Sequence, residues 1–342
     1  MMDLRLGDCL EILPTLADNS VDLIATDPPY FRVKDEDWDR QWSDADRFIV
    51  WIGQLCQQWQ RVLKPNGSLY VFASPKMAAR VEIEIARWFN VLNRITWRKH
   101  DGTENEGGLW SRADKDTLRC FFEQKEEIIF AEHFGADNIA KGEAGYEAKC
   151  DELRGFVFEP LRRYLDEERK RAVVNFDQVR QIVGCAPGSG LPSHWFTRSQ
   201  WMLPTREAYE KLRAGFSRLD HGGDYLRREY DDLRREYDDL RRPFRVTPDV
   251  PYTDVWSFAT VQAYPGKHPA EKPIDLMKHI IRTSSRPGAT VLDSCMGSGT
   301  TGKAAQELGR DFIGIEKSPV WFERARTRIE TVQLDLFGGT GA

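Results

Sequence analysis

Residues 25–31, Ala-Thr-Asp-Pro-Pro-Tyr-Phe, follow a short apolar run that reads as a buried strand, residues 21–25. Proline ends strands because it cannot donate a hydrogen bond to the ladder. Ending a strand, however, requires neither the acid before the prolines, Asp27, nor the aromatic residue after them, Tyr30. The carboxylate, the rigid carbonyl of Pro28 and the ring together supply two acceptors and a stacking surface. We predict that this set holds a planar group that carries an exocyclic amine.

A glycine-rich turn near the other end of the chain is the second candidate for chemistry. A strand ends at Asp293, the turn Gly297-Ser298-Gly299 follows, and a helix begins at Thr300. Glycines at such a turn let the backbone approach a ligand closely. The next strand ends in Glu316, about 20 residues on, where a carboxylate can bind ribose hydroxyls. A turn required only by packing is the alternative, but this strand context favours a nucleoside-binding half.

Alternating strands and helices surround both stretches. Apolar spacing predicts helices over 47–63, 77–88, 300–308 and 319–330, and short apolar runs predict strands over 68–73, 90–97, 127–131, 290–293 and 312–316. A turn at residues 64–67, Lys-Pro-Asn-Gly, is expected to end the first helix. This alternation predicts a doubly wound α/β fold, a parallel sheet with helices on its faces. The strand ends share one edge, so Asp27 and the glycine-rich turn should meet there.

Two sheet halves, residues 1–133 and 253–332, flank an insert at 134–252 that is expected to be mainly helical, and a flexible tail follows at 333–342. Between residues 151 and 245 there are 17 arginines, 2 lysines and 17 acids. Arginine suits phosphate and guanine contacts. The equal number of acids also suits solvated helices joined by ion pairs, and both interpretations stay open.

One part of the insert resembles a helix-turn-helix. Residues 176–183 and 191–201 read as helices, and the glycine-rich residues 184–190 read as the turn between them. The second helix would offer His194, Arg198 and Gln200 to the major groove of DNA. An ordinary helix pair is the alternative.

A tandem repeat, Leu-Arg-Arg-Glu-Tyr-Asp-Asp, begins at residues 226 and 233. Its apolar residues alternate by four and three, which gives a heptad-like seam: Leu226, Tyr230, Leu233, Tyr237 and Leu240. We expect a charged helical arm that packs on the insert. A contact to a second subunit, which would make a homodimer, or a contact along DNA is the alternative.

Bulk properties exclude several classes of protein. The formal net charge of −5 does not by itself indicate a nucleic-acid partner, and the six cysteines form no Cys-x-x-Cys pair, so neither a zinc site nor another metal site is predicted. The first residues carry acids and lack the apolar core of a signal peptide. No run approaches the roughly 20 apolar residues of a membrane span. A reduced, cytoplasmic protein is expected.

The motifs and their order resemble the S-adenosylmethionine-dependent DNA amino-methyltransferases of the circularly permuted beta class. In that class the Asp-Pro-Pro-Tyr motif comes first, a target-recognition region follows, and the cofactor motif comes last. The resemblance covers residues 1–133 and 253–330, whereas the insert matches by position only. It implies a Rossmann-like methyltransferase sheet, S-adenosylmethionine as cofactor and double-stranded DNA as partner. Because of the permutation, the first strand should lie beside the strand at 312–316.

The resemblance also implies roles for individual residues. The catalytic tetrapeptide is Asp27, Pro28, Pro29 and Tyr30, and the cofactor-binding residues are Asp8, His268, Lys272, Pro273, Asp293, Gly297, Ser298, Gly299, Thr300 and Glu316. In the family the acid matched by Asp8 meets the adenine of the cofactor, and the segment at 267–273 helps to hold its methionine end. One departure is that Ser294-Cys295 stands where the family commonly has Pro-Phe, which bears on the wall of the cofactor pocket.

The implied reaction is methyl transfer to an exocyclic amine of a base that is flipped out of the duplex. Asp27 and the Pro28 carbonyl would accept hydrogen bonds from the two N–H groups of the amine. Tyr30 would stack on the base, and Phe31 and Trp38 would line or close the base pocket. In the family, Asp at the first motif position goes mainly with N6 of adenine and Ser with N4 of cytosine. Asp27 therefore favours adenine, with cytosine as the alternative.

Other classes of function fit less well. Protein glutamine methyltransferases have Asn-Pro-Pro-Tyr after the cofactor motif, so both the acid and the order disagree. No hydride-transfer site resembling that of a nicotinamide dehydrogenase is evident. A DNA-binding relative without activity would not need the intact motifs.

The peptide Gln-Leu-Asp-Leu-Phe, Gln333 to Phe337, resembles the short segment by which bacterial proteins bind the replication sliding clamp. Its place after the last predicted helix suits a peptide ligand. The alternative is that its apolar residues fold back onto the core.

Overall fold

The computed structural model of the 342-residue chain describes residues 1–100, 119, 121, 123–136, 145–186, 188–198, 200–219, 223–246 and 252–332. The predicted clamp peptide lies outside these residues. The chain divides into two compact units, Met1–His133 with Pro243–Ala342, and Phe134–Arg242. Each unit has a hydrophobic core of its own.

The sequence predicts that the insert ends at residue 252, whereas the second unit ends at Arg242. Residues after Arg242 pack with the first unit. The Arg245 backbone N–H donates to the Thr283 carbonyl (2.8 Å), and the Phe244 ring stacks on Phe130 with 5.8 Å between centroids.

Within the described residues, the first unit contains one sheet of eight strands. Their spatial order is β1 (Met2–Leu6), β8 (Asp311–Glu316), β7 (Thr290–Asp293), β2 (Val21–Thr26), β3 (Leu63–Ala73), β5 (Lys125–Glu132), β4 (Asn90–His100) and β6 (Val255–Ala259). All neighbours are parallel except the pairs that β5 makes with β3 and β4. The predicted doubly wound α/β fold is confirmed. The predicted parallel sheet is wrong in one strand, because β5 runs back along β4.

Strand β1 lies beside β8, as expected. The two pair in parallel from Met2 opposite Phe312 to Leu6 opposite Glu316. Beyond the last pair, the Gly7 N–H donates to the Glu316 carbonyl (2.9 Å). The residues that follow β1 are thereby brought to the edge of the sheet where Glu316 lies.

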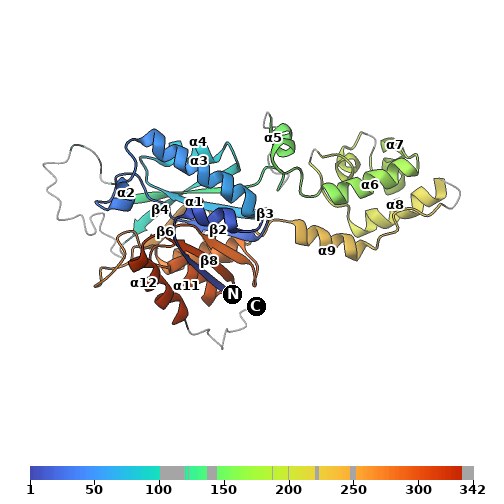
Figure 1. Cartoon of the computed structure of the whole chain (residues 1–342). Coiled ribbons are helices and arrows are strands. Elements are labelled where there is room, and N and C mark those ends of the chain that lie inside the picture. Colours follow the sequence, from blue (N-terminus) through green and yellow to red (C-terminus); the bar gives the residue numbers. More distant parts are fainter. Residues whose placement is uncertain are drawn as a thin grey trace. The chain divides into compact units, whose positions relative to one another are not determined.

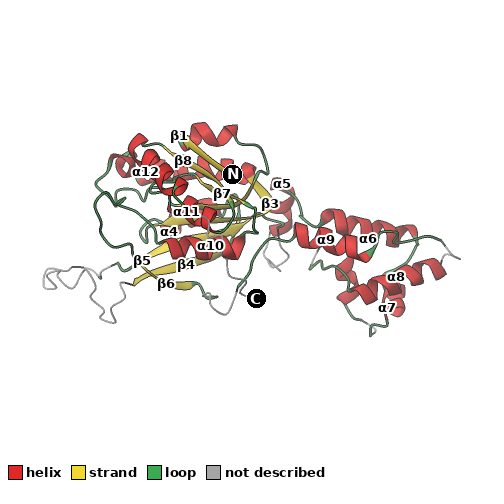
Figure 2. Cartoon of the chain, turned by 90° about the horizontal axis from the view of Figure 1, so that it is seen from below, coloured by secondary structure: helices red, strands yellow, loops and turns green. Residues whose placement is uncertain are grey.

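Helices cover both faces of this sheet (Figure 1). One face carries α1 (Cys9–Ile12), the short helix η1 (Leu13–Thr15), α3 (Ala45–Val62) and α4 (Ala78–Ile85), and the other carries α10 (Ile274–Ser284), α11 (Thr300–Glu307) and α12 (Pro319–Glu330). Figure 2 shows α10 and α11 in red over the yellow strands. The sheet is therefore covered on both sides, and its strand ends remain available for a site.

Helix α3 illustrates how the sequence forms these elements. Asp44 caps its first turn by accepting the backbone N–H of Arg47 (2.9 Å). Phe48, Ile52 and Trp59 recur on one face and are fully buried. Each such side chain contributes about 1.5–3 kcal/mol by leaving water.

The expected turn at residues 64–67 does not separate α3 from the next strand. Strand β3 already begins at Leu63, which pairs with Val21, and the pairing resumes with Ser68 opposite Leu23. The prediction of a turn before the strand is therefore wrong. The four residues form a bulge inside the strand, where proline and glycine are tolerated.

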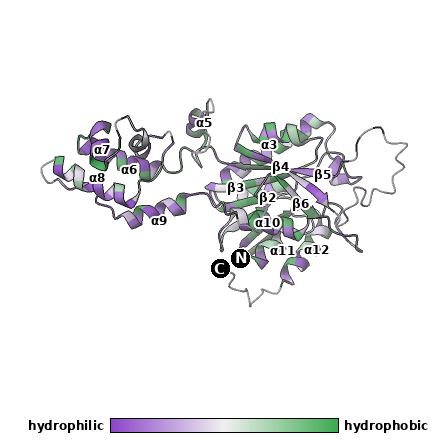
Figure 3. Cartoon of the chain, turned by 180° about the vertical axis from the view of Figure 1, so that it is seen from behind, coloured by the Kyte–Doolittle hydropathy of each residue, from purple (hydrophilic) through white to green (hydrophobic). Residues whose placement is uncertain are grey.

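The second unit is mainly helical. It contains α5 (Tyr146–Leu153), α6 (Glu159–Arg171), α7 (Phe176–Val183), the 3₁₀ turn η4 (Leu191–Trp195), α8 (Arg206–Leu219) and α9 (Tyr230–Leu240). Its core is built from Leu161, Leu165, Phe196, Leu212 and Phe216, among others. Figure 3 shows hydrophobic and hydrophilic residues mixed along α8 and α9, as expected for amphipathic helices on a small core.

The predicted helix-turn-helix is wrong in its second helix. Residues after the turn form only the five-residue η4 and then irregular backbone, with Gln200 in the left-handed region (φ 55°). Trp195, Phe196 and Trp201 are all buried, and the Trp201 indole donates to the Trp195 carbonyl (2.9 Å). In an α-helix Trp195 and Trp201, six positions apart, would lie on different faces. Burying both rings in one core therefore requires a backbone that is not α-helical.

The tandem repeat packs on its own unit, as expected. Leu226 and Leu233 are fully buried in the core of that unit, and Tyr237 and Leu240 pack against it. In this repeat the helix begins only at Tyr230, and Leu226 adopts a left-handed conformation (φ 49°). The predicted continuous heptad seam is therefore wrong for the first copy.

Among the described residues, no helix has both the length and the apolar character needed to cross a membrane.

Gly302 on α11 tests the packing below the glycine-rich turn. A Cβ at this position would collide with the rings and side chains of Phe312 and Ile329. We expect Gly302→Ala to lower the free energy of unfolding by about 1–3 kcal/mol, since overpacking outweighs the gain in helix propensity. Chemical denaturation measures the change.

The matched control is Gly53→Ala on α3, where the added Cβ meets only the end of the Glu84 side chain. This variant should be as stable as the parent or up to about 1 kcal/mol more stable, because alanine favours helices. Equal destabilisation by both changes would contradict the packing described.

Candidate active site

The catalytic and glycine-rich stretches meet at the carboxyl edge of the parallel strands. Strand β2 leads into Asp27, β7 ends at Asp293, and the two strands pair in parallel. The Thr26 hydroxyl donates to Asp293 Oδ1 (3.0 Å) across this pair. Two stretches far apart in the sequence are thus joined directly, as predicted.

Asp293 organises the turn that follows it. Its carboxylate also accepts the Thr301 hydroxyl (2.6 Å) and the Cys295 N–H (3.1 Å). Burial raises the pKa of Asp293 to about 6, although these hydrogen bonds oppose the shift. Ser294, at the position of the departure from the family pattern, is buried and accepts the Trp59 indole N–H (3.2 Å).

A cavity of about 290 Å³ opens at this edge. Most predicted site residues line it: Asp8, Asp27, Pro28, Pro29, Tyr30, Trp38, His268, Lys272, Asp293, Gly297, Ser298, Thr300 and Glu316. Three other predicted residues of the first unit do not. Gly299 (φ 75°) packs against Ala325, and Pro273 precedes α10 as its N-cap.

Phe31 is the third residue that does not line the cavity. Its ring stacks on Phe48 of α3 with 5.7 Å between centroids. The predicted role of Phe31 in the pocket wall is therefore wrong. Its left-handed backbone (φ 62°) turns the side chain toward the core.

Two carboxylates, those of Glu316 and Asp8, line the part of the cavity next to the glycine-rich turn. Glu316 accepts the N–H groups of Gly297 and Ser318 (both 2.8 Å), and burial raises its pKa. Asp8 accepts the Leu10 N–H (2.9 Å) and pairs with Lys317 (2.9 Å). Each carboxylate oxygen can accept more than one hydrogen bond, so both acids can still bind hydroxyl or amino groups.

His268 is held as a neutral ring. Burial, together with the charge of Lys272, lowers the pKa of His268 to about 4. Its Nδ1 accepts the Ala270 N–H (3.2 Å), which places the proton on Nε2. The ring lies between Trp38 (6.0 Å, stacked) and Trp321 (4.5 Å, edge-on).

A buried chain of alternating charges surrounds the catalytic tetrapeptide. Lys272 Nζ lies 2.5 Å from Asp27 Oδ2 and 3.3 Å from Glu126 Oε2. Lys99 pairs with Glu126 Oε1 (2.6 Å), and the Tyr30 hydroxyl donates to Glu126 Oε2 (2.7 Å). Two ammonium groups therefore neutralise two carboxylates. The Lys272 ammonium also lies 5.0 Å from the centroid of the Tyr30 ring.

The two carboxylates of this chain differ in their affinity for protons. Burial and the Glu126 charge raise the pKa of Asp27, against the attraction of Lys272. Burial also opposes ionisation of Glu126, but Lys272 and Lys99 outweigh it and lower the pKa of Glu126 to about 2. Asp27 is thus the better base, and its buried Oδ1 has no hydrogen-bond partner in the described part of the chain.

Sequence reasoning missed Glu126 and Lys99. Glu126 stands at the start of a strand that the sequence predicts to be parallel, and the start of a parallel strand lies at the edge away from the site. In the observed sheet β5 is antiparallel, so its first residues lie beside the end of β4, with Glu126 opposite Trp97. The signal was the Lys-Glu-Glu sequence that opens an otherwise apolar strand.

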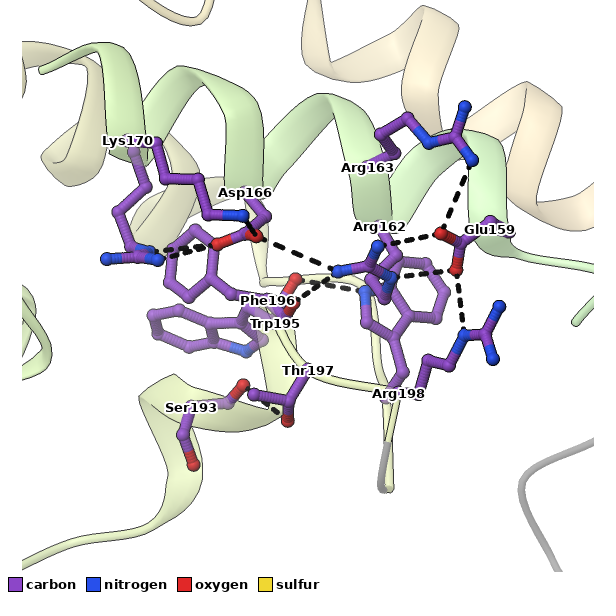
Figure 4. A network of polar contacts seen from close by, with 12 residues as sticks. Glu159, Arg162, Arg163, Asp166, Lys170, Ser193, Trp195, Phe196, Thr197 and Arg198 are labelled. Carbon is purple, nitrogen blue, oxygen red and sulfur yellow. Dashed lines mark hydrogen bonds and ion pairs between the residues drawn. The ribbon is translucent and has the colours of Figure 1, made fainter. Parts of the chain in front are cut away.

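The remaining predicted DNA contacts, His194, Arg198 and Gln200, lie in the second unit. Figure 4 shows Arg198 paired with Glu159. Arg198 pairs with Asp151 (2.7 Å) and Glu159 (3.3 Å), and Glu159 also binds Arg162. Asp166 likewise forms ion pairs with Arg162, Arg169 and Lys170. These arginines form ion pairs within the unit. Neither His194 nor Gln200 lies on an α-helix that could enter the major groove.

The pattern of the DNA methylase family, N6/N4 type, matches residues 21–326. The chain belongs to this family. It is 22% identical to the type II methyltransferase M.HinfI of Haemophilus influenzae, over 96% of this chain and 68% of that protein. It is 24% identical to the DNA adenine methyltransferase YhdJ of Escherichia coli K12, over 95% of this chain and 81% of that protein.

Solved structures share the fold. The M1.HpyAVI–SAM complex matches with a TM-score of 0.50 and 18% identity, over 96% of this chain and 99% of that one. The cytosine-N4-specific PvuII DNA methyltransferase matches with a TM-score of 0.53 and 13% identity, over 98% and 88%. These likenesses show the fold, a Rossmann-like methyltransferase sheet. The family match makes the chain an S-adenosylmethionine-dependent DNA methyltransferase.

The residues of the cavity fit S-adenosylmethionine. The glycine at 297 keeps open the space in front of His268, because a Cβ there would lie 3.3 Å from the imidazole ring. Glu316 and Asp8 supply acceptors for ribose hydroxyls and an adenine amine on the same side. Asp27 lines the cavity, and its buried Oδ1 has no hydrogen-bond partner among the described residues, so it can accept a hydrogen bond from an amine.

Lys272 tests the energetic role of the buried charge chain. Lys272→Met would leave Asp27 buried without its ion-pair partner, while Glu126 would keep its pair with Lys99. Removing one partner of a buried ion pair typically costs about 3–5 kcal/mol, and we expect a loss of this size in the free energy of unfolding. Chemical denaturation of the variant measures it.

The control is Lys278→Met, which removes an ion pair to Glu307 whose two side chains are each about a quarter exposed. Partly exposed pairs contribute at most about 1 kcal/mol. If the two variants lost the same stability, the buried chain would not have the role described.

Proposed function

We propose that this protein methylates N6 of adenine in double-stranded DNA at a specific sequence, with the base flipped into the cavity beside Asp27. The observation that carries the proposal is that Asp27 and Pro28 both line the cavity and that the buried Oδ1 of Asp27 has no hydrogen-bond partner among the described residues. Asp at the first motif position favours adenine in the family, and one relative is named an adenine methyltransferase. N4 of cytosine, an exocyclic amine of the same kind, is the competing target.

The target nitrogen is a poor nucleophile because its lone pair is delocalised into the ring. Asp27 Oδ1 and the Pro28 carbonyl accept hydrogen bonds from the two N–H groups of this nitrogen, and these bonds localise its lone pair on the nitrogen. The two prolines hold both acceptors in place, so little reorganisation accompanies the reaction. When bound, S-adenosylmethionine supplies an electrophilic sulfonium methyl group.

Tyr30 supplies the surface on which the base stacks. Its hydroxyl is anchored on Glu126, and the Lys272 ammonium lies near its ring. The methylated amine must lose a proton. Asp27 is placed to take it, because its pKa is raised while that of Glu126 is lowered to about 2.

The base cannot be reached inside a duplex and must be flipped out. We propose that the second unit, residues 134–242, is the target-recognition region. Its position between the two sheet halves in the sequence supports this assignment. Contacts of its arginines with phosphate would have to compete with the ion pairs that they already make.

Asp27→Ala tests the acceptor role. We expect the rate of methyl transfer to fall by at least about 10²–10³-fold, the size of effect seen when one preorganised group is removed. Binding of S-adenosylmethionine, measured by calorimetry, should persist. Transfer of labelled methyl groups to DNA at the parent rate would refute the assignment, and Asp37→Ala, an exposed change nearby, is the control.

Methylated DNA identifies the base directly. Expression in a host that lacks DNA methylation, followed by mass spectrometry of nucleosides and sequencing of modified bases, should yield N6-methyladenine at one sequence. N4-methylcytosine would contradict the choice of base but would leave the amine chemistry intact. The absence of any modified base would contradict the proposed activity.

Glu126→Gln tests the coupling between the two carboxylates through the pH profile. Asp27 is a strong acceptor and can take a proton from the amine only when it is ionised, so the rate falls as the pH drops through its pKa. The Glu126 charge raises the pKa of Asp27. Removing that charge lowers this pKa, and the acid limb of the rate profile should move to lower pH.

Glu127→Gln is the matched control. Glu127 is also buried and is adjacent on β5, but it does not line the cavity and binds Lys125 and Thr96 instead. This variant should keep the acid limb of the parent. A shift to higher pH in Glu126→Gln would contradict the charge coupling.

A further inference from the structure

The segment after the catalytic tetrapeptide wraps around one buried carboxylate. Asp39, on the short helix α2 (Asp37–Arg40), has no exposed surface. Its Oδ1 accepts the backbone N–H of Tyr30, and its Oδ2 accepts those of Val33 and Lys34, each at 2.6 Å. Its own carbonyl accepts the N–H of Arg32 (2.8 Å).

This carboxylate accounts for a backbone that the sequence does not otherwise favour. Phe31 and Arg32 both adopt left-handed conformations (φ 62° and 61°), which L-residues other than glycine rarely adopt. The resulting turn brings several N–H groups toward one point and leaves them without a strand or helix partner. A carboxylate can accept all of them at once, whereas an amide or hydroxyl group has fewer acceptor sites.

The same contacts fix Tyr30 from two sides. Its backbone N–H is bound by Asp39, and its hydroxyl is bound by Glu126 on β5. The residue before Asp39, Trp38, stacks on His268 in the cofactor half of the cavity. The segment 30–39 is therefore tied to the sheet, to the cofactor side and to itself.

We propose that Asp39 is a positioning residue for methyl transfer, an inference that rests on the proposed function. It holds the backbone of Tyr30 and, through the two rigid prolines, keeps the acceptors Asp27 and Pro28 and the stacking ring in register. Asp39 also lines the cavity, but both oxygens of its carboxylate are bound by backbone N–H groups, so it acts on the reaction through Tyr30. Nothing in the sequence pattern that identified the tetrapeptide pointed to an acid nine positions beyond Tyr30.

Asp39→Asn is the test variant, because asparagine has the same shape but replaces one acceptor oxygen with an N–H donor. That donor would face the N–H of Tyr30 or those of Val33 and Lys34. We expect kcat to fall about 10²-fold, since a shift of about 1 Å in a positioned group has this effect. The dissociation constant of S-adenosylmethionine should stay at the parent value.

Asp37→Asn, an exposed change on the same helix and outside the cavity lining, is the matched control and should keep the parent kcat. If Asp39→Asn does not accumulate as folded protein, Asp39→Ser takes its place. Serine is small and can accept one of the N–H groups without opposing the others. The same direction of change in kcat is expected.

Arg32→Gly distinguishes positioning from general stabilisation. Glycine adopts the left-handed conformation without strain, so adding Arg32→Gly to the Asp39 variant should restore part of kcat. A fall in the melting temperature of the Asp39 variant with kcat unchanged would overturn the proposal. A loss of cofactor affinity equal to the loss of kcat would overturn it as well.

The parent protein separates this proposal from the proposed function. If the parent transfers no methyl group to DNA, the proposed function fails. If the parent is active and the Asp39 variants are equally active, only the positioning role fails.

Discussion

The ion pair between Asp27 and Lys272 is the interaction on which the rest of the site depends. Both side chains are largely withdrawn from water, and an isolated charge at either position would be strongly disfavoured. Glu126 and Lys99 extend the pair into a neutral chain of four groups, so that Asp27 can remain ionised while one of its oxygens stays unpartnered. An acceptor kept charged and available at the cavity wall is what an exocyclic amine requires.

The fold explains why these four groups can meet. Asp27 follows a central parallel strand, Lys272 precedes α10, and Lys99 and Glu126 come from β4 and β5. The single reversed strand among those described brings the start of β5 to the edge where the parallel strands end. The cofactor half is joined to the same edge through Thr26 and Asp293. One sheet edge thus carries the acceptor, the stacking ring and the carboxylates that fit a nucleoside.

Much of this could be predicted from the sequence, because the signals were local. The apolar run before Asp27, the glycine-rich turn and the acid at Glu316 each report on their own strand, and parallel strands share an edge. The place of Glu126 could not be predicted, since it depends on the direction of a strand rather than on its composition. The prediction of an α-helix over residues 191–201 was wrong for a similar reason. The local sequence favours a helix, but the burial of Trp195, Phe196 and Trp201 in the core of the unit outweighs that local preference.

A double-mutant cycle of Lys272→Met and Glu126→Gln, followed by methyl-transfer rate and by the free energy of unfolding, tests most directly whether the charge chain acts as a unit. The account predicts that the double variant is less impaired than the sum of the single variants, with a coupling energy of about 0.5–3 kcal/mol, because Lys272 and Glu126 contact each other directly. Each single variant leaves the chain with one net charge, whereas the double variant leaves Asp27 and Lys99, whose charges sum to zero. Simple additivity of the two changes would contradict it.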